Sequence, residues 1–259
     1  MYYLLTHFHS LLLCLVFTLL VVIVSCLAFN KIRKKLDRKS LEENSEAVGI
    51  IFGVISLLYS LIIAFVLVAV WEDYEELNST ITNEADKLDV IMIHAHELPD
   101  SLSQNIYSHI KKYTGRVIEV EWLTNPKYKI VNTELTSMRY DIFKMHLTDE
   151  TQQDVLKEIN NDMNDLSDLR HERLSHNYSH VPDLVWVILI FGTLIILFCS
   201  MLFYMSSVRL QFALISMLAI IISLCLFLLF TLDHPFEGTS AVKSEPYLEV
   251  LKTVNNLIH

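Results

Sequence analysis

Residues 48–71 of the chain read VGIIFGVISLLYSLIIAFVLVAVW and contain no charged side chain. A helix crosses the hydrocarbon core of a membrane with about 20 apolar residues, so this stretch is long enough to span it. The next stretch, 72–98, is EDYEELNSTITNEADKLDVIMIHAHEL, which is strongly polar. Within it one series recurs at spacings of three and four residues: Tyr74, Leu77, Ile81, Glu84, Leu88, Ile91, Ala95 and Leu98. Together the two stretches predict a membrane-spanning helix that continues for about seven turns into water.

Three further stretches, 11–29, 184–204 and 210–232, also lack charged residues and are long enough to span a membrane. The whole chain is 53% hydrophobic and only 19% charged, whereas a soluble domain carries about 25% charged residues. We therefore predict an all-α membrane protein. It has four transmembrane helices, with a helical extramembrane domain inserted between the second and the third.

The predicted organisation divides the chain into seven segments. They are an N-terminal segment with the first transmembrane helix (1–29), a basic cytoplasmic loop (30–47), the second transmembrane helix (48–71), an acidic helical domain (72–183), the third (184–204) and fourth (210–232) transmembrane helices, and a C-terminal segment (233–259). Within the acidic domain we expect further helices over about 100–122, over 133–146, and from an N-cap at Asp149 toward Pro182.

Basic residues predict the orientation in the membrane. Those of the first loop follow the first apolar stretch directly: Lys31, Arg33, Lys34, Lys35, Arg38 and Lys39. Arg209 lies between the third and fourth stretches, and no lysine or arginine precedes the first. Because cytoplasmic loops carry the excess of basic residues, both termini and residues 72–183 are expected outside the cytoplasm. The membrane expected is the inner (plasma) membrane of a bacterium.

Several classes of function find no support in the sequence. The net charge of −10 argues against nucleic-acid binding. No G-x-S-x-G, H-E-x-x-H or Gly-rich phosphate loop occurs, so neither an enzyme nor a cofactor is expected. His176 and His180 are four residues apart and could share a helix face, but beyond His171 no third ligand is indicated, so no metal site is predicted.

Small and weakly polar residues form one face of the second predicted span. They are Gly49, Gly53, Ser56, Ser60 and Ala64, at spacings of four, three, four and four. Small residues allow close helix–helix packing in lipid. The alternative is a pore-lining face whose hydroxyl groups contact passing ions. In a ring of identical helices the two interpretations are compatible.

Glu84 is the one charged residue of the apolar series that follows the second span. Burial of an unpaired, unhydrated carboxylate costs several kcal/mol. The series could open to water at this level, Glu84 could pair with Arg170 or Arg173 on the chain returning to the third span, or Glu84 could belong to a charged ring near a pore. We favour the ion pair.

Three blocks of residues resemble the bestrophin-like domain family of bacterial and plant membrane proteins. The first block runs from Gly53 through Trp71 to Leu98-Pro99, the second starts at Arg170-His-Glu-Arg173, and the third is Asp233-His-Pro235-Phe236-x-Gly238. The resemblance implies a relation to bestrophins, which are homo-oligomeric, usually pentameric ion channels whose second span lines the pore. It also makes Trp71, Asp233, Pro235, Phe236 and Gly238 family-signature positions. Bestrophins place their large domain in the cytosol, which is opposite to the orientation predicted above from charge.

The sequence therefore predicts a homo-oligomeric bestrophin-like ion channel, most simply a pentamer, with the second transmembrane helix lining the pore. Its expected partners are further copies of the chain, the lipid bilayer and inorganic ions. The alternative is a non-conducting membrane scaffold or sensor whose acidic helical domain binds a partner.

The orientation can be tested by cysteine labelling of intact cells. In a cysteine-free variant, Lys129→Cys should react with a membrane-impermeant thiol reagent and Ser40→Cys should not. The reverse pattern would replace this orientation with the bestrophin one.

Overall fold

The computed structural model describes residues 2–35, 38–122, 133–144, 149–176, 180–236 and 241–258. Helix makes up 89% of the structure, and no strand occurs in these ranges. The predicted all-helical class is therefore confirmed. The chain divides into two compact units, the first formed by Met1–Tyr74 and His180–Ala241 and the second by Glu75–Ser179 and Val242–His259.

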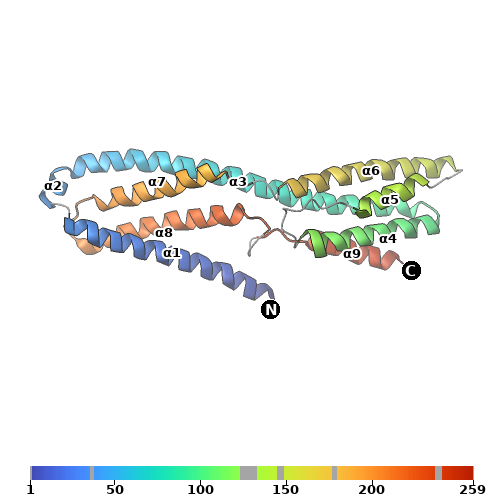
Figure 1. The fold of residues 1–259 in the computed structure, drawn as a ribbon, viewed down its shortest axis with the longest axis horizontal. Coiled ribbons are helices and arrows are strands. Elements are labelled where there is room, and N and C mark those ends of the chain that lie inside the picture. Colours follow the sequence, from blue (N-terminus) through green and yellow to red (C-terminus); the bar gives the residue numbers. More distant parts are fainter. Residues whose placement is uncertain are drawn as a thin grey trace. The chain divides into compact units, whose positions relative to one another are not determined.

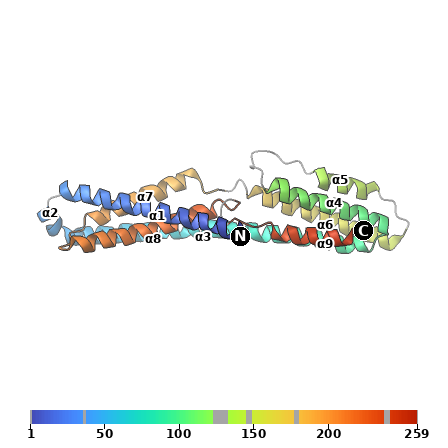
Figure 2. The ribbon, with the colours of Figure 1, turned by 90° about the horizontal axis from the view of Figure 1, so that it is seen from below.

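The first unit contains the apolar helices. They are α1 (Tyr2–Lys35), the short α2 (Arg38–Glu43), α3 (Ser45–His96) as far as Tyr74, α7 (Asp183–Met201) and α8 (Val208–Leu232). Four of them, α1, α3, α7 and α8, are long and apolar enough to cross a membrane, which confirms the four predicted spans as helices. Both views show α1 alongside α8 (Figures 1 and 2).

Burial within this unit is uneven among the four spans. In α7 and α8, 33% and 28% of the most apolar window is buried inside the chain, but in α1 and α3 only 6% is. Most of the apolar surface of α1 and α3 is thus not covered by the chain itself. In a membrane protein such surface contacts lipid or other subunits.

Tyr59 joins α3 to α7 inside this apolar unit. Its hydroxyl group donates to the carbonyl oxygen of Leu189 at 2.8 Å and lies 2.6 Å from the Thr193 hydroxyl. The Tyr59 ring lies against Gly192, where a Cβ atom would overlap the ring. Glycine at this position therefore allows the aromatic ring to approach the α7 backbone, and the hydroxyl group finds partners that lipid cannot offer.

The second unit is a bundle of helices. Beside the second half of α3 it contains α4 (Asp100–Arg116), the π-helix η1 (Val117–Glu121), α5 (Thr133–Lys144), α6 (Glu150–Ser175) and α9 (Glu245–Leu257). Asp149 caps α6, because its side chain accepts the Thr151 backbone N–H at 2.9 Å, as the sequence predicted. The apolar series of α3 faces the core of this bundle, with Leu77, Ile81, Leu88 and Ile91 no more than 1% exposed.

The C-terminal helix α9 is an element that the sequence analysis missed. Pro246 lies in its first turn, where a missing N–H disturbs no helical hydrogen bond. Tyr247, Val250 and Val254 form its buried face, and the helix lies alongside α4 in both views (Figures 1 and 2). The part of the chain from Val242 onward is thus a structural part of the second unit.

Gly192→Ala should destabilise the protein by about 1–3 kcal/mol, because the new methyl group overlaps the Tyr59 ring. Thermal unfolding in detergent, followed by circular dichroism, measures this. The matched control is Gly53→Ala, since no atom lies within 4 Å of a Cβ at Gly53. Equal stability of the two alanine variants would contradict the close approach of Tyr59 to Gly192.

Candidate functional site

Glu84 and Arg173 form a buried ion pair in the second unit. Arg173 Nε donates to Glu84 Oε2 at 2.7 Å and Arg173 Nη2 to Glu84 Oε1 at 3.1 Å. The two bonds form the parallel, bidentate arrangement in which guanidinium and carboxylate interact most strongly. The Glu84 side chain is 0% exposed and that of Arg173 2%, so water does not weaken the pair. Of the two partners considered for Glu84, Arg173 is the one in contact.

Glu121 on η1 joins a second arginine to this pair. Arg173 Nη2 donates to Glu121 Oε2 at 2.8 Å, and Arg170 Nη2 donates to Glu121 Oε1 at 2.7 Å. Arg170 is therefore paired with Glu121 rather than with Glu84. Two carboxylates face two guanidinium groups, so the cluster is neutral as a whole, which is the condition for keeping charges away from water.

Two tyrosines complete the cluster, which we call the buried network: Glu84, Tyr113, Glu121, Arg170, Arg173 and Tyr247. The Tyr113 hydroxyl group donates to Glu84 Oε1 at 2.5 Å. The guanidinium carbon of Arg173 lies 5.7 Å from the centre of the Tyr247 ring. The buried network therefore joins α3, α4, η1, α6 and α9, and Tyr247 brings the C-terminal helix into it.

The protonation states follow from burial and from the charges nearby. Burial and the negative charge of Glu84 raise the pKa of Tyr113 and of Tyr247 well above the ordinary tyrosine value, so both stay protonated. Burial raises the pKa of Glu121, but hydrogen bonds and positive charge from Arg170 and Arg173 outweigh it and leave that pKa below its ordinary value of 4.5. The resulting stabilisation is present above pH 4.5 and is lost as the pH falls through the lower, folded-state pKa.

The end of α4 explains how Glu121 reaches the arginines. The Trp122 N–H bonds to the Val117 carbonyl oxygen at 3.0 Å, five residues back, which makes the last turn a π-turn. Single π-turns occur often at functional sites. The sequence pattern predicts one amphipathic helix over 100–122, and Glu121 is not among the predicted site residues. A signal was present, because Glu121 follows Val117 by four residues in the same apolar series.

Asp233, which the resemblance predicts as a family-signature position, links the ends of α7 and α8 in the first unit. Its Oδ1 accepts the Val181 N–H at 2.7 Å, and its Oδ2 accepts the Trp186 indole N–H at 3.2 Å. The Asp233 carbonyl oxygen lies 2.9 Å from Nδ1 of His180. With 6% exposure, Asp233 acts as a buried acceptor that fixes the start of α7 against the end of α8.

The other signature positions have less direct roles. Pro235 is buried and Phe236 partly buried, next to Asp233. Trp71 is 50% exposed, with its ring 6.3 Å from that of Tyr74. An exposed tryptophan at the end of a span suits the membrane interface. Gly238 lies outside the described residues.

The small face of α3 differs from the face that packs inside the chain. Side chains that pack against α7 and α8 are Phe52, Ile55, Tyr59, Ile63, Val66 and Leu67. Of the small residues, Gly53, Ser60 and Ala64 are exposed, and Gly49 and Ser56 are half-buried. The predicted pore face is therefore mostly uncovered by the chain's own helices.

The model of the Bestrophin-like domain family matches residues 16–247. The chain belongs to the bestrophin-like domain family. The match includes the first span from residue 16 onward, the other three spans, the Asp233 contacts and every residue of the buried network, and it confirms the resemblance seen in the sequence. No curated protein and no solved structure matches the chain. With its four long apolar helices, this member of the bestrophin-like family is a membrane protein.

Removing Glu84 from this bestrophin-like protein should be strongly destabilising. Glu84→Ala leaves Arg173 with one carboxylate in place of two and the Tyr113 hydroxyl group without an acceptor, at a cost of about 3–5 kcal/mol. Adding Arg173→Met should cost less than the sum of the single losses, because the two groups share one interaction. Denaturant unfolding in detergent measures how much Glu84→Ala, Arg173→Met and the double variant each lower the free energy of unfolding.

Asp154 and Lys157 provide the control for that experiment, since they form an exposed ion pair at 2.7 Å, with side chains 67% and 72% exposed. Asp154→Ala should therefore cost about 1 kcal/mol or less. Additive losses at Glu84 and Arg173, or losses as small as that of the control, would contradict a coupled buried network.

Proposed function

We propose that this bestrophin-like protein forms a homo-oligomeric ion channel in which the membrane-spanning part of α3 lines the pore. The relation to bestrophin channels supports a channel and favours a pentamer. The observation that carries the assignment of the pore helix is that Gly53, Ser60 and Ala64 of the small face stay exposed beside the face of α3 that packs against α7 and α8.

A pore needs surface that is left free after the subunit has folded. Tyr59 and five neighbouring bulky side chains of α3 pack against α7 and α8, whereas others, such as Leu57 and Phe65, are exposed. Gly53, Ser60 and Ala64 are not used for that packing, and α3 as a whole buries only 6% of its apolar window. In a ring of subunits this unused face can turn toward a shared axis.

The chemistry of the small face suits a water-filled path. Rings of large apolar side chains close a pore by dewetting, whereas glycine, serine and alanine leave it wide and partly polar. The Ser60 hydroxyl group donates to the Leu57 carbonyl oxygen at 2.8 Å, so its own oxygen remains available to water or an ion. From Gly53 to Ala64 the face extends for roughly 16 Å, about half of the hydrocarbon thickness.

Ser60→Leu should reduce single-channel conductance in planar bilayers by at least about tenfold, because it introduces a bulky apolar ring into the pore. The oligomer should still assemble, since Ser60 is exposed in the subunit. Ser56→Leu should act in the same direction from one turn earlier.

The matched control is Val54→Leu, which also adds bulk to an exposed position of α3. Val54 is two residues from Ser56 and therefore lies about 200° around the helix from it. The conductance of Val54→Leu should equal that of the wild type. If Ser60→Leu assembles and conducts normally, α3 does not line the pore, and if the variant fails to assemble, the small face is a packing surface.

A further inference from the structure

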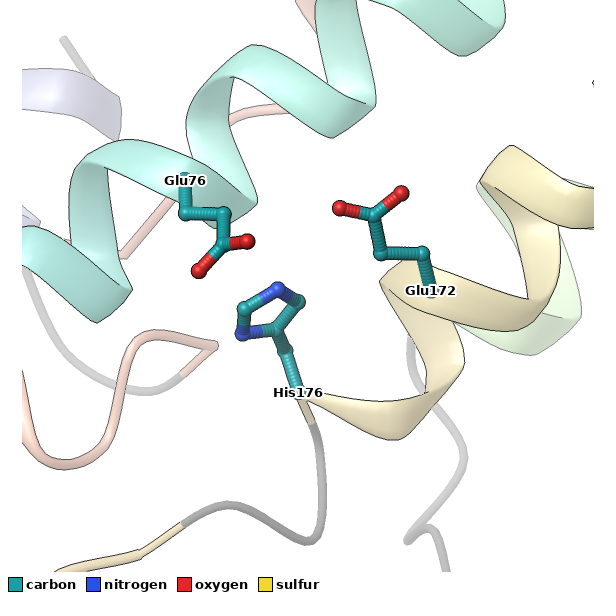
Figure 3. Close-up of side chains that lie close together, drawn as sticks. All are labelled: Glu76, Glu172 and His176. Carbon is teal, nitrogen blue, oxygen red and sulfur yellow. The ribbon is translucent and has the colours of Figure 1, made fainter.

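Glu76, Glu172 and His176 bring two carboxylates and an imidazole together in the second unit. Each offers one possible ligand atom, and these atoms lie within 4.8 Å of one another. Figure 3 shows Glu76 projecting from α3 toward Glu172 and His176, which come from the end of α6. Helix bundles commonly hold metal ions with such side chains on facing helices.

The spacing along each helix produces this arrangement. Glu172 and His176 are four residues apart, so they lie on one face of α6. Glu76 and Thr80 are likewise four residues apart on α3. The Thr80 hydroxyl group donates to Glu172 Oε1 at 3.1 Å, which orients that carboxylate from outside the cluster. A hydrogen bond of this kind is typical of groups that position metal ligands.

The two carboxylates differ from those of the buried network in their partners. Among the residues that the structure describes, no lysine or arginine forms an ion pair with Glu76 or Glu172. Like charges at this separation repel each other unless a cation lies between them. The charge of the cluster therefore favours a bound cation.

An acidic groove of 540 Å³ adjoins the cluster and points to the same class of ligand. It shares Glu172 with the cluster and is also lined by Asp86, Asp165 and Asp168. Its one lysine, Lys87, is held by Asp162 and Asp165 at 3.2 and 3.0 Å. Excess negative charge in a groove raises the local concentration of cations.

We propose that Glu76, Glu172 and His176 bind a divalent transition-metal ion of the zinc class. Calcium and magnesium prefer sites built from oxygen atoms alone, whereas an imidazole nitrogen favours zinc and its neighbours. Three protein ligands with water in the remaining position is a common zinc arrangement. Bonds of about 2.0–2.2 Å require the ligand atoms to approach to roughly 3.3 Å, which the exposed Glu76 side chain permits by rotation.

A bound ion joins α3 to α6 within the second unit. The site does not depend on conduction, so it goes beyond the proposed channel function. Thr80 is a positioning residue in this proposal, since it acts on the metal through Glu172.

The test is zinc competition with a chromophoric chelator, using the purified full-length protein in detergent. The wild type should bind one zinc ion per chain, and millimolar calcium or magnesium should not displace it. Glu76→Gln, Glu172→Gln and His176→Gln should each weaken binding at least about tenfold, and Thr80→Val should weaken it by about 10-fold or more. Zinc should also raise the melting temperature of the wild type but not that of the ligand variants.

Glu75→Gln and His96→Gln are the matched controls, because both residues are exposed on α3 outside the cluster. Both should bind zinc as the wild type does. Glu76 is itself exposed, so Glu76→Gln tests the site without disturbing the core. Wild-type affinity in the three ligand variants, absence of zinc binding to the wild type, or displacement by calcium or magnesium would overturn the proposal.

Discussion

The second unit depends on one constraint, which is that the charges in its core must be neutralised by one another. Removing a carboxylate or a guanidinium group from water costs several kcal/mol unless a well-placed partner compensates. Glu84 and Arg173 meet that condition only if α3 and α6 hold one register, and Glu121 adds the end of α4 to the same requirement. The apolar stripes of these helices would tolerate some sliding, whereas the bidentate contact would not. The buried network therefore selects a single arrangement of helices that apolar packing alone would leave less specific.

Other carboxylates of the described residues have their negative charge compensated in other ways, according to the groups that lie next to them. Asp233 in the first unit accepts the Val181 and Trp186 N–H groups, so it is compensated by neutral donors. Glu76 and Glu172 face each other at the surface of the second unit, where water screens them and a cation can reach them. Among the described residues, Glu84 and Glu121 of the network are almost completely buried together with Arg173, at 0%, 1% and 2% side-chain exposure.

Much of the fold could be predicted because its strongest signals are local. The length of apolar stretches defined four spans, and spacings of three and four residues predicted that α3 continues past Tyr74 with Glu84 on its buried face. The remainder depends on contacts between residues far apart in the sequence. The partner Glu121, the docking of Tyr247 and the meeting of Glu76 with Glu172 each need the bundle to be assembled first. Helix α9 was missed although its buried residues Tyr247, Val250 and Val254 recur at spacings of three and four residues.

Two glycines in the spans, Gly192 and Gly53, differ in what surrounds them. Glycine inside a helix costs about 1 kcal/mol relative to alanine, so its presence needs a reason. At Gly192 the reason lies within the chain, because the Tyr59 ring occupies the space that a side chain would need. At Gly53 no atom lies within 4 Å of a Cβ position, so the folded subunit gives no reason for glycine there. In the oligomer proposed above, a neighbouring copy that packs closely or a pore that needs width would supply the reason.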